Sequence, residues 1–301
     1  MLTKTLAFAV CLTALGSGSA FADPKFEYGK AEEVAKVKDT EYNASVEGGI
    51  VFTTGNSETI TATGGIKAAR KTGKNKLSVE GNLTYAKSGV RVLKDNNGNG
   101  LVDDASEITT EKQTTAETLA GKIRYDRFLD GSNSLYAALL GARDVPAGKK
   151  VTLGGQVGYS RRLYKSKTAE AVGEFGYDYS HEDLVSGDSI SIHSARALVG
   201  YKAEMTEGAT FETNLEGLTN LNKEELATRP DGASFGEDTR INFKASVSAK
   251  IGKNLSFQTT LEAKYDNRPG PLTIKNLAMG FVPEAAKLDT IMKASLIYTI
   301  F

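Results

Sequence analysis

The chain of 301 residues has one cysteine, no tryptophan, two histidines and six prolines. Cys11 lies near the start, so the rest of the chain has no thiol for a disulfide or a thiolate metal site. Net charge is also lacking, because 37 lysines and arginines balance 37 aspartates and glutamates. The chain has no run of basic residues that would indicate a nucleic-acid partner. Beyond the first residues, no hydrophobic run is long enough for a membrane helix.

The start of the chain has the features of a secretory signal peptide. Lys4 supplies a positive charge, residues 6–15 form a short apolar run, and an A-x-A cleavage site ends at Ala22. The last residues, 296–301, close on an aromatic residue, which resembles the C-terminal signal of bacterial outer-membrane barrels. We therefore expect an exported chain with three parts. These are a signal peptide at 1–22, a periplasmic N-terminal tail at 23–40 and an outer-membrane β-barrel at 41–301.

The dominant pattern in the rest of the chain is alternation. Between residues 239 and 266, apolar side chains such as Ile241, Phe243 and Val247 alternate with polar ones on both sides of a turn at 252–254. Successive side chains of a strand point to opposite faces, so the pattern predicts a hairpin with one apolar and one charged face. Each arm has about a dozen residues, whereas soluble strands usually have 5–6 and a tilted strand needs about 9–11 to cross a bilayer.

Similar segments recur along the chain and predict about twelve strands. The connections alternate between tight turns and long segments, which is typical of outer-membrane barrels with short periplasmic turns and long extracellular loops. The sequence therefore predicts an all-β fold, a transmembrane up-and-down antiparallel β-barrel of about 12 strands. We expect it in the outer membrane of a Gram-negative bacterium, with both termini periplasmic. The expected strands are 41–54, 58–71, 76–88, 114–127, 134–143, 150–164, 168–180, 189–204, 209–220, 239–251, 255–267 and 288–301.

Alternation alone leaves open which face is outside, because a soluble lipocalin-type barrel has the same period. Tyrosine placement favours lipid on the apolar side, since ten of the twelve tyrosines are assigned to the apolar phase near strand ends. Two bands of tyrosine are typical of two membrane interfaces. The bands are Tyr42, Tyr125, Tyr136, Tyr159, Tyr201 and Tyr298 at the turn ends, and Tyr85, Tyr177, Tyr179 and Tyr265 at the loop ends.

Two pairs of segments carry a family resemblance. The first pair is Tyr42-Asn43-Ala44-Ser45-Val46-Glu47-Gly48-Gly49 with Gly55-Asn56-Ser57-Glu58-Thr59. The second pair is Gly154-Gly155-Gln156-Val157-Gly158-Tyr159 with Glu174-Phe175-Gly176-Tyr177. Together they resemble the salt-induced outer membrane proteins, a domain family of unknown function. The resemblance implies an outer-membrane barrel and brings no assigned activity.

One expected loop carries a calcium-binding pattern, D-x-N-x-N-G. Alternate oxygen side chains there can fold around one hard cation, Gly100 permits the sharp turn, and Leu101 offers its carbonyl. Position 12 is Ser106 in place of the usual glutamate, so any Ca²⁺ site is expected to be weak, with a dissociation constant on the order of 10⁻⁴–10⁻³ M. A polar surface turn is the alternative, since Asn-Gly pairs mark turns. The expected ligands are Asp95, Asn97, Asn99, Leu101 and Asp103.

The polar phase of the later strands carries many charges, and their sign alternates between neighbouring strands. Opposite charges on facing strands favour cross-strand pairing. Two interpretations stay open. The charges line a water-filled pore and tune ion passage, or they neutralise one another in an occluded lumen. The expected lumen-facing charges are Glu170, Glu174, Asp178, Arg196, Lys202, Glu212, Glu216, Arg240, Lys244, Lys250, Glu262 and Lys264.

Catalytic candidates are few. His193 and Ser194 are adjacent on a strand and therefore face opposite sides, while His181 lies beside Glu182 and Asp183 in an expected outer loop. We expect no catalytic residue and no enzyme. The expected function is a passive channel or an osmotic or salt-response surface protein, in contact with outer-membrane lipid and with small solutes or ions. The alternative is a closed barrel whose long loops bind calcium, lipopolysaccharide or a partner, and the remote alternative is an outer-membrane hydrolase.

Overall fold

The computed structural model describes residues 40–53, 59–93, 108–145, 148–185, 187–226, 229–269 and 287–300. Twelve strands in this part form one closed antiparallel barrel, and two short strands form a separate hairpin. The barrel strands are β1 (Glu41–Thr53), β2 (Thr59–Thr72), β3 (Asn75–Leu93), β4 (Ile108–Phe128), β5 (Asn133–Asp144), β6 (Lys149–Lys165), β7 (Ala169–Leu184), β8 (Ser189–Thr206), β9 (Ala209–Asn220), β12 (Thr239–Lys250), β13 (Leu255–Asp266) and β14 (Leu288–Thr299). The hairpin consists of β10 (Glu224–Leu226) and β11 (Arg229–Ala233).

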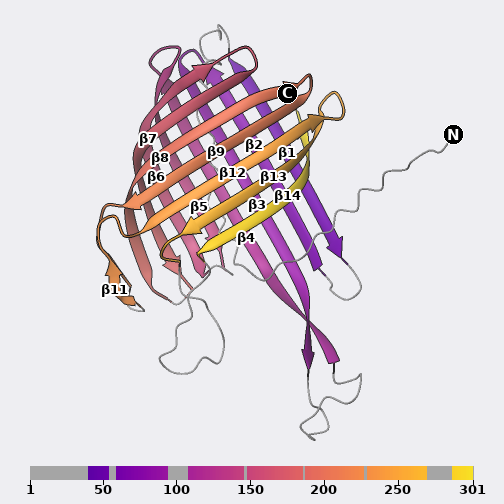
Figure 1. Ribbon diagram of the computed structural model, residues 1–301, viewed down its shortest axis with the longest axis vertical. Helices are drawn as coiled ribbons and strands as arrows, with labels where there is room; N and C mark the ends of the chain where they lie inside the picture. The colour runs from indigo at the N-terminus through magenta and orange to yellow at the C-terminus, as the bar shows by residue number, and fades with distance from the viewer. Residues whose placement is uncertain are drawn as a thin grey trace, which may run out of the picture.

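Each barrel strand pairs with its neighbours in sequence, except that β9 pairs directly with β12 past the inserted hairpin. The sheet closes where β1 pairs with β14, with Val46 opposite Tyr298. Because the strand number is even, β1 begins and β14 ends at the same end of the barrel, which we call the turn end (Figure 1). The opposite end carries the β10–β11 hairpin and is called the loop end. The predicted up-and-down barrel of about twelve strands is confirmed.

Two features at the loop end differ from the expected strands. β3 and β4 pair as far as Leu93 opposite Ile108, so this hairpin projects beyond the barrel (Figure 1). A β-bulge between Ala86 and Lys87 shifts the register there. A bulge breaks strict alternation, which explains why the expected strands stopped at residue 88 and began at residue 114, short of the ends of β3 and β4. The second difference is the β10–β11 hairpin, which lies in a segment expected to be a loop.

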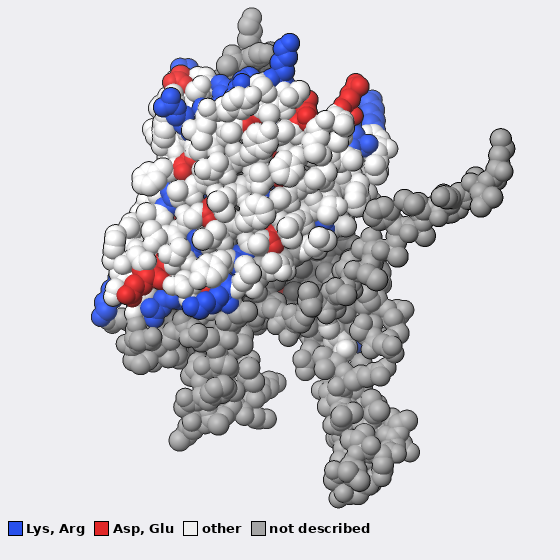
Figure 2. Space-filling view, in the orientation of Figure 1, with Lys and Arg blue, Asp and Glu red and all other residues white. Residues whose placement is uncertain are grey.

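Apolar side chains cover the outside of the barrel wall. Leu139, Phe175 and Met292 are each more than 60% exposed, and many other large apolar side chains of the strands are exposed with them. Figure 2 shows a mostly uncharged wall with charged side chains gathered toward its two ends. An apolar outer band around a polar interior is the organisation of outer-membrane barrels. The exposed side chains therefore face lipid.

Within the described residues, no helix has the length and apolar character to span a membrane.

The assignment of Tyr136 to the apolar outer phase is wrong. Its side chain is only 4% exposed and lies inside the barrel, while its neighbour Leu135 is 50% exposed on the outside. The cause is visible in the sequence of β5, where Ala and Leu occur in both phases, as at Ala138 and Leu139. Alternation in this strand is too weak to separate the two faces. The inward tyrosine becomes part of the site described next.

Candidate functional site

A network of arginines and carboxylates fills the lumen on the side formed by β4 to β9. Its centre is Arg196 on β8, which is 0% exposed. Arg196 Nη1 donates to Glu174 Oε2 on β7 at 2.8 Å, and Arg196 Nε donates to Glu216 Oε1 on β9 at 2.5 Å. Arg196 Nη1 also donates to the Tyr136 hydroxyl at 2.7 Å. One guanidinium group thus connects β5, β7, β8 and β9.

A second guanidinium extends the network to β4. Arg124 Nη2 donates to Glu174 Oε1 at 2.7 Å and to Asp126 Oδ1 at 2.7 Å. Its guanidinium carbon lies 4.1 Å from the centre of the Tyr136 ring, at the distance of a cation–π contact. We call Arg124, Asp126, Tyr136, Glu174, Arg196 and Glu216 the arginine network. None of these side chains is more than 5% exposed.

Two glycines make room for Tyr136. A Cβ added at Gly158 on β6 would lie 2.6 Å from the Tyr136 hydroxyl oxygen, and one added at Gly176 on β7 would lie 2.8 Å from it. Both distances are shorter than van der Waals contact, and the added Cβ atoms would also meet the carbonyl oxygens of Phe175 and Val157, so a larger residue would shift the tyrosine or the adjacent strand. This gives a physical role to the glycine-rich strands noted in the sequence.

The charges of the network are held by hydrogen bonds from several strands. Removing charges from water costs several kcal/mol per ion, and excellent geometry is needed to offset it. Here Glu174 accepts from both arginines, and Glu216 accepts a further hydrogen bond from Asn242 Nδ2 at 3.0 Å. Three carboxylates face two guanidinium groups, so the ionised network has a net charge of −1.

The other predicted lumen charges occupy the same inner face in smaller groups. Lys202 Nζ lies 2.7 Å from Glu212 Oε1, and both side chains are about one third exposed. Glu262 is paired with Lys293 of β14 at 3.3 Å. Asp178 Oδ1 accepts from Gln156 Nε2 at 2.7 Å. Lys202–Glu212 and Lys293–Glu262 are therefore neutral ion pairs, whereas Asp178 is held by a neutral amide.

The remaining predicted charges are less enclosed. Glu170 is opposite Lys202 in the β7–β8 ladder, and Lys244 is opposite Glu262 in the β12–β13 ladder. Lys264 is partly exposed. Lys250 is exposed at the turn end. The structure thus brings Lys202 and Lys244 opposite carboxylates of adjacent strands.

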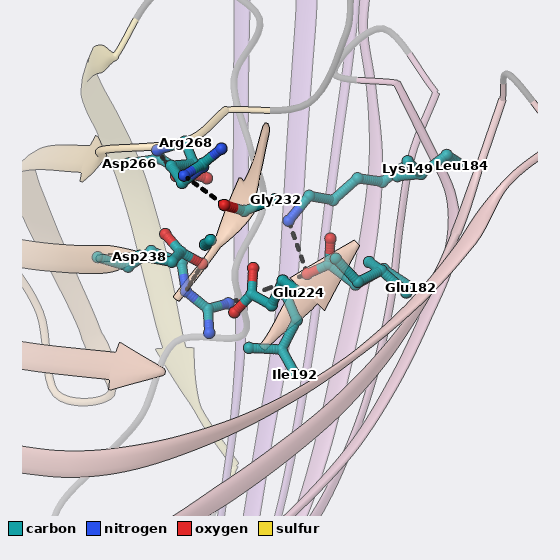
Figure 3. A pocket seen from close by; sticks show the side chains of 12 residues that line it. Lys149, Glu182, Leu184, Ile192, Glu224, Gly232, Asp238, Asp266 and Arg268 are labelled. Atoms are coloured by element: carbon teal, nitrogen blue, oxygen red, sulfur yellow. Dashed lines mark hydrogen bonds and ion pairs between the residues drawn. The ribbon is translucent and has the colours of Figure 1, made fainter. Parts of the chain in front are cut away.

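A cavity lies at the loop end of the lumen, beside the β10–β11 hairpin (Figure 3). The space between its walls, counted together with the part open to solvent, is about 520 Å³. Lys149 Nζ crosses it to Glu182 Oε1 at 2.8 Å. Arg240, the last of the predicted lumen charges, lies between Asp238 Oδ2 at 3.8 Å and Glu182 Oε1 at 4.0 Å. We call this space the loop-end cavity.

The two carboxyl groups of the loop-end cavity that lie outside the barrel strands, those of Glu224 and Asp238, have raised pKa values. The pKa of Glu224 is raised to about 7, chiefly by burial and also by the carboxylates of Asp238, Glu182 and Asp266, while Arg240 opposes them. Burial also raises the pKa of Asp238. The cavity therefore disfavours the ionised form of these carboxyl groups, chiefly because it is buried.

The expected calcium ligands lie outside the described residues, at positions 95–103 between β3 and β4. Across the described part of the chain, no group of three or more His, Cys, Asp and Glu side chains is placed to hold a metal ion. The calcium site stays a prediction.

Residues 46–299 match a family described as "Protein of unknown function, DUF481". The chain belongs to the DUF481 family. The family description assigns no salt response, so that part of the sequence resemblance stays a prediction. A comparison with curated proteins found no match.

Several solved structures are similar to this DUF481 chain. The NanC porin aligns at 11% identity and a TM-score of 0.42, covering 86% of this chain and 98% of that one. The COG4313 outer membrane channel from Pseudomonas putida F1 aligns at 10% identity and a TM-score of 0.47, covering 92% and 100%. An anion-selective porin from Comamonas acidovorans aligns at 10% identity and a TM-score of 0.37, covering 87% and 100%. The strand order and the apolar outer face, rather than these likenesses, establish the fold.

Both histidines of the DUF481 barrel lie on its outer wall near the loop end. His181 Nδ1 lies 3.0 Å from Ser191 Oγ across the β7–β8 ladder, and His181 Nε2 lies 3.5 Å from Asp183 Oδ1. Sequence reasoning missed Ser191 because it compared neighbours along the strand rather than partners across the hairpin. His193 packs against the Tyr179 ring at 5.0 Å between ring centres, and Ser194 points inward and is 0% exposed.

This outer cluster has the residue types of a hydrolase, but acyl transfer also needs donors for an oxyanion. The nearby backbone N–H of His193 already donates to Asn222 Oδ1 at 2.8 Å. The cluster combines tyrosine and histidine rings at the edge of the apolar wall. Such amphipathic rings are typical of a membrane interface. We therefore interpret it as part of the aromatic belt.

The sequence also missed half of the arginine network. Arg124, Asp126 and the buried Lys122 alternate with Ile123 and Tyr125 on a strand whose position was expected. Their inward phase could have been read from that alternation alone. Tyr136 could not, because β5 alternates too weakly.

Proposed function

We propose that this DUF481 protein is an outer-membrane channel for small ions and solutes, narrowed inside the barrel by the arginine network. The turn end then faces the periplasm and the loop end faces the exterior, as is usual for barrels with short periplasmic turns. The observation that carries the proposal is the inner wall of the barrel, which is charged at several heights.

Stability alone does not account for this wall. Replacing a buried ion pair with apolar residues of similar volume is often neutral or stabilising by about 1–4 kcal/mol. A barrel that only needed a filled interior would therefore do as well with apolar side chains. A charged lining instead suits a lumen in which water and ions move, because charged rings tune ion passage.

The size of the barrel limits what can pass. A barrel of twelve strands is intermediate in size. In an eight-stranded barrel side chains fill the interior, whereas a 16-stranded porin encloses an aqueous channel. The network occupies part of this intermediate lumen with two fully buried arginines. Small inorganic ions are therefore the expected permeants, and the paired charges favour weak selectivity between anions and cations.

Planar-bilayer recordings of the refolded protein test the channel. We expect small, ohmic current steps in potassium chloride with a small reversal potential on the side of cations across a salt gradient, because the arginine network has a net charge of −1 and the other ion pairs of the lumen are neutral. The same detergent without protein is the control. A fully folded barrel that inserts and carries no current contradicts the proposal and leaves a closed barrel.

The chain between β3 and β4 supports a second role at the surface. The β3–β4 hairpin projects past the rest of the wall (Figure 1), and the calcium-binding pattern lies in the sequence between its two strands. We expect Ca²⁺ to bind weakly, with a dissociation constant on the order of 10⁻⁴–10⁻³ M, and the heat of binding to disappear in Asp95→Asn. Titration calorimetry measures this.

Asp104→Asn is the matched control for calcium binding, because it removes the same charge from a residue outside the ligand pattern. Equal loss of binding in both variants would mean that general negative charge, and not a coordination site, attracts the ion.

A further inference from the structure

The loop-end cavity has more carboxylates than cations. Four acidic side chains, Glu182, Glu224, Asp238 and Asp266, line it together with three basic ones. The carboxylates come from separate elements, namely β7, β10, the segment before β12, and β13. When all of these groups are ionised, the cavity has a net charge of −1.

The three basic side chains of the cavity are already engaged. Lys149 is bonded to Glu182 at 2.8 Å. Arg240 Nη2 donates to Ser194 Oγ at 3.0 Å, and Arg268 Nη1 donates to the Gly232 carbonyl at 3.3 Å. Arg240 also lies 3.8 Å from Asp238 Oδ2 and 4.0 Å from Glu182 Oε1, so it balances part of the negative charge of the cavity.

Two carboxylate oxygens in the cavity accept no hydrogen bond within the described part of the chain. They are Glu224 Oε1 and Asp238 Oδ1, and their residues are only 7% and 4% exposed. A buried polar atom without a partner costs about 1–3 kcal/mol, and more when it is charged. Figure 3 shows both side chains at the same cavity. These two oxygens are therefore open to a further hydrogen-bond donor, since the nearest guanidinium, that of Arg240, lies 3.8 Å from the other oxygen of Asp238.

The other side of the cavity is apolar. Leu184, Ile190 and Ile192 of β7 and β8 are each at most 9% exposed and line it, together with Ala233 of the hairpin. A bare metal ion would gain nothing from this surface, and the described carboxylates are not placed as a metal-ligand group. A short alkyl chain attached to a cationic head would be covered by it.

We propose that the loop-end cavity binds a primary alkylammonium group, with its N–H donors directed to Glu224 and Asp238 and its alkyl chain against Ile190 and Ile192. The cation supplies the missing charge and the missing donors in one group. This inference deepens the proposed function because it names a class of solute recognised at the outer mouth of the channel.

The binding depends on pH through Glu224. Its pKa of about 7 means that the carboxyl group is mostly neutral at pH 6 and mostly ionised at pH 8. The groups that act on it are Asp238, Glu182, Asp266 and Arg240, of which only Arg240 favours its ionised form. A cation prefers the ionised carboxylate, so its affinity rises from pH 6 to pH 8.

Titration calorimetry of the full barrel in detergent with butylammonium chloride tests the site. We expect saturable binding at pH 8, weaker binding at pH 6, and a loss of affinity of about tenfold or more in Glu224→Gln, which removes a charged hydrogen bond. Glu207→Gln removes the same charge from an exposed turn at the other end and should leave the affinity unchanged. Sodium propionate has a similar chain with a negative head and should not bind.

Three results would overturn the proposal: no binding by a folded barrel, equal binding by Glu224→Gln and the parent protein, or equal competition by sodium chloride. The last would assign the site to inorganic cations. The calorimetry does not require ion flow. A barrel that conducts without binding the amine rejects only this inference, and a barrel that binds without conducting rejects only the channel.

Discussion

Replacing Arg196 with methionine lowers the free energy of unfolding by about 3–5 kcal/mol, because removing one partner of a buried ion pair leaves an uncompensated charge. Arg196 is 0% exposed and is the shared donor to Glu174, Glu216 and Tyr136. Methionine keeps an unbranched chain in the space but supplies no donor. Glu216 is then left with the donor of Asn242, and Glu174 with Arg124.

Urea unfolding of the protein in lipid vesicles, followed by the loss of β-structure, measures this change. Lys202→Met is the matched control, since Lys202 lies on the same strand and is paired with Glu212 at 2.7 Å, but both side chains are about one third exposed. Exposed pairs contribute about 0.2–1 kcal/mol. Equal losses in the two variants would show that the network is no more enclosed than the pair near the turn end.

The barrel could be predicted because its strands obey a simple rule. In β12 and β13 every second side chain faces lipid. The apolar residues Ile241, Phe243 and Val247 therefore identify the outer face of the strand. Their length and the alternation of short and long connections then select a membrane barrel. The rule fails where the ladder is irregular. Because of the β-bulge at Ala86, alternation did not predict the projecting end of the β3–β4 hairpin.

The site was harder to predict than the wall. Alternation places Glu174, Arg196 and Glu216 on the inner face, but it does not say which of them meet. Directly opposite Arg196 are Gly176 and Leu218, and its carboxylate partners lie diagonally two residues away. Such diagonal neighbours are within reach of long side chains, so register alone does not select the pairs. The loop-end cavity depends on Glu224, whose short strand β10 has no amphipathic period.

Removing the centre of the arginine network should widen the channel. In the triple variant Glu174→Ala, Arg196→Ala and Glu216→Ala, we expect a severalfold larger single-channel conductance, because three long side chains leave the lumen together. The choice of residues retains the Arg124–Asp126 pair at 2.7 Å, so no buried arginine is left without a carboxylate. A single substitution would leave a buried charge without its partner. The resulting loss of stability would then be difficult to separate from a wider lumen.

The same variant changes ion preference with a predictable sign. It removes two negative charges and one positive charge, so the narrow section becomes more positive by one unit and the reversal potential shifts toward that of anions. Lys202→Ala with Glu212→Ala is the control, because it removes a neutral pair that is already partly exposed. The control should change conductance much less and leave the selectivity as it was. If the triple variant is folded and conducts no better than the parent protein, the arginine network does not limit flow, and the narrowing must lie elsewhere in the lumen.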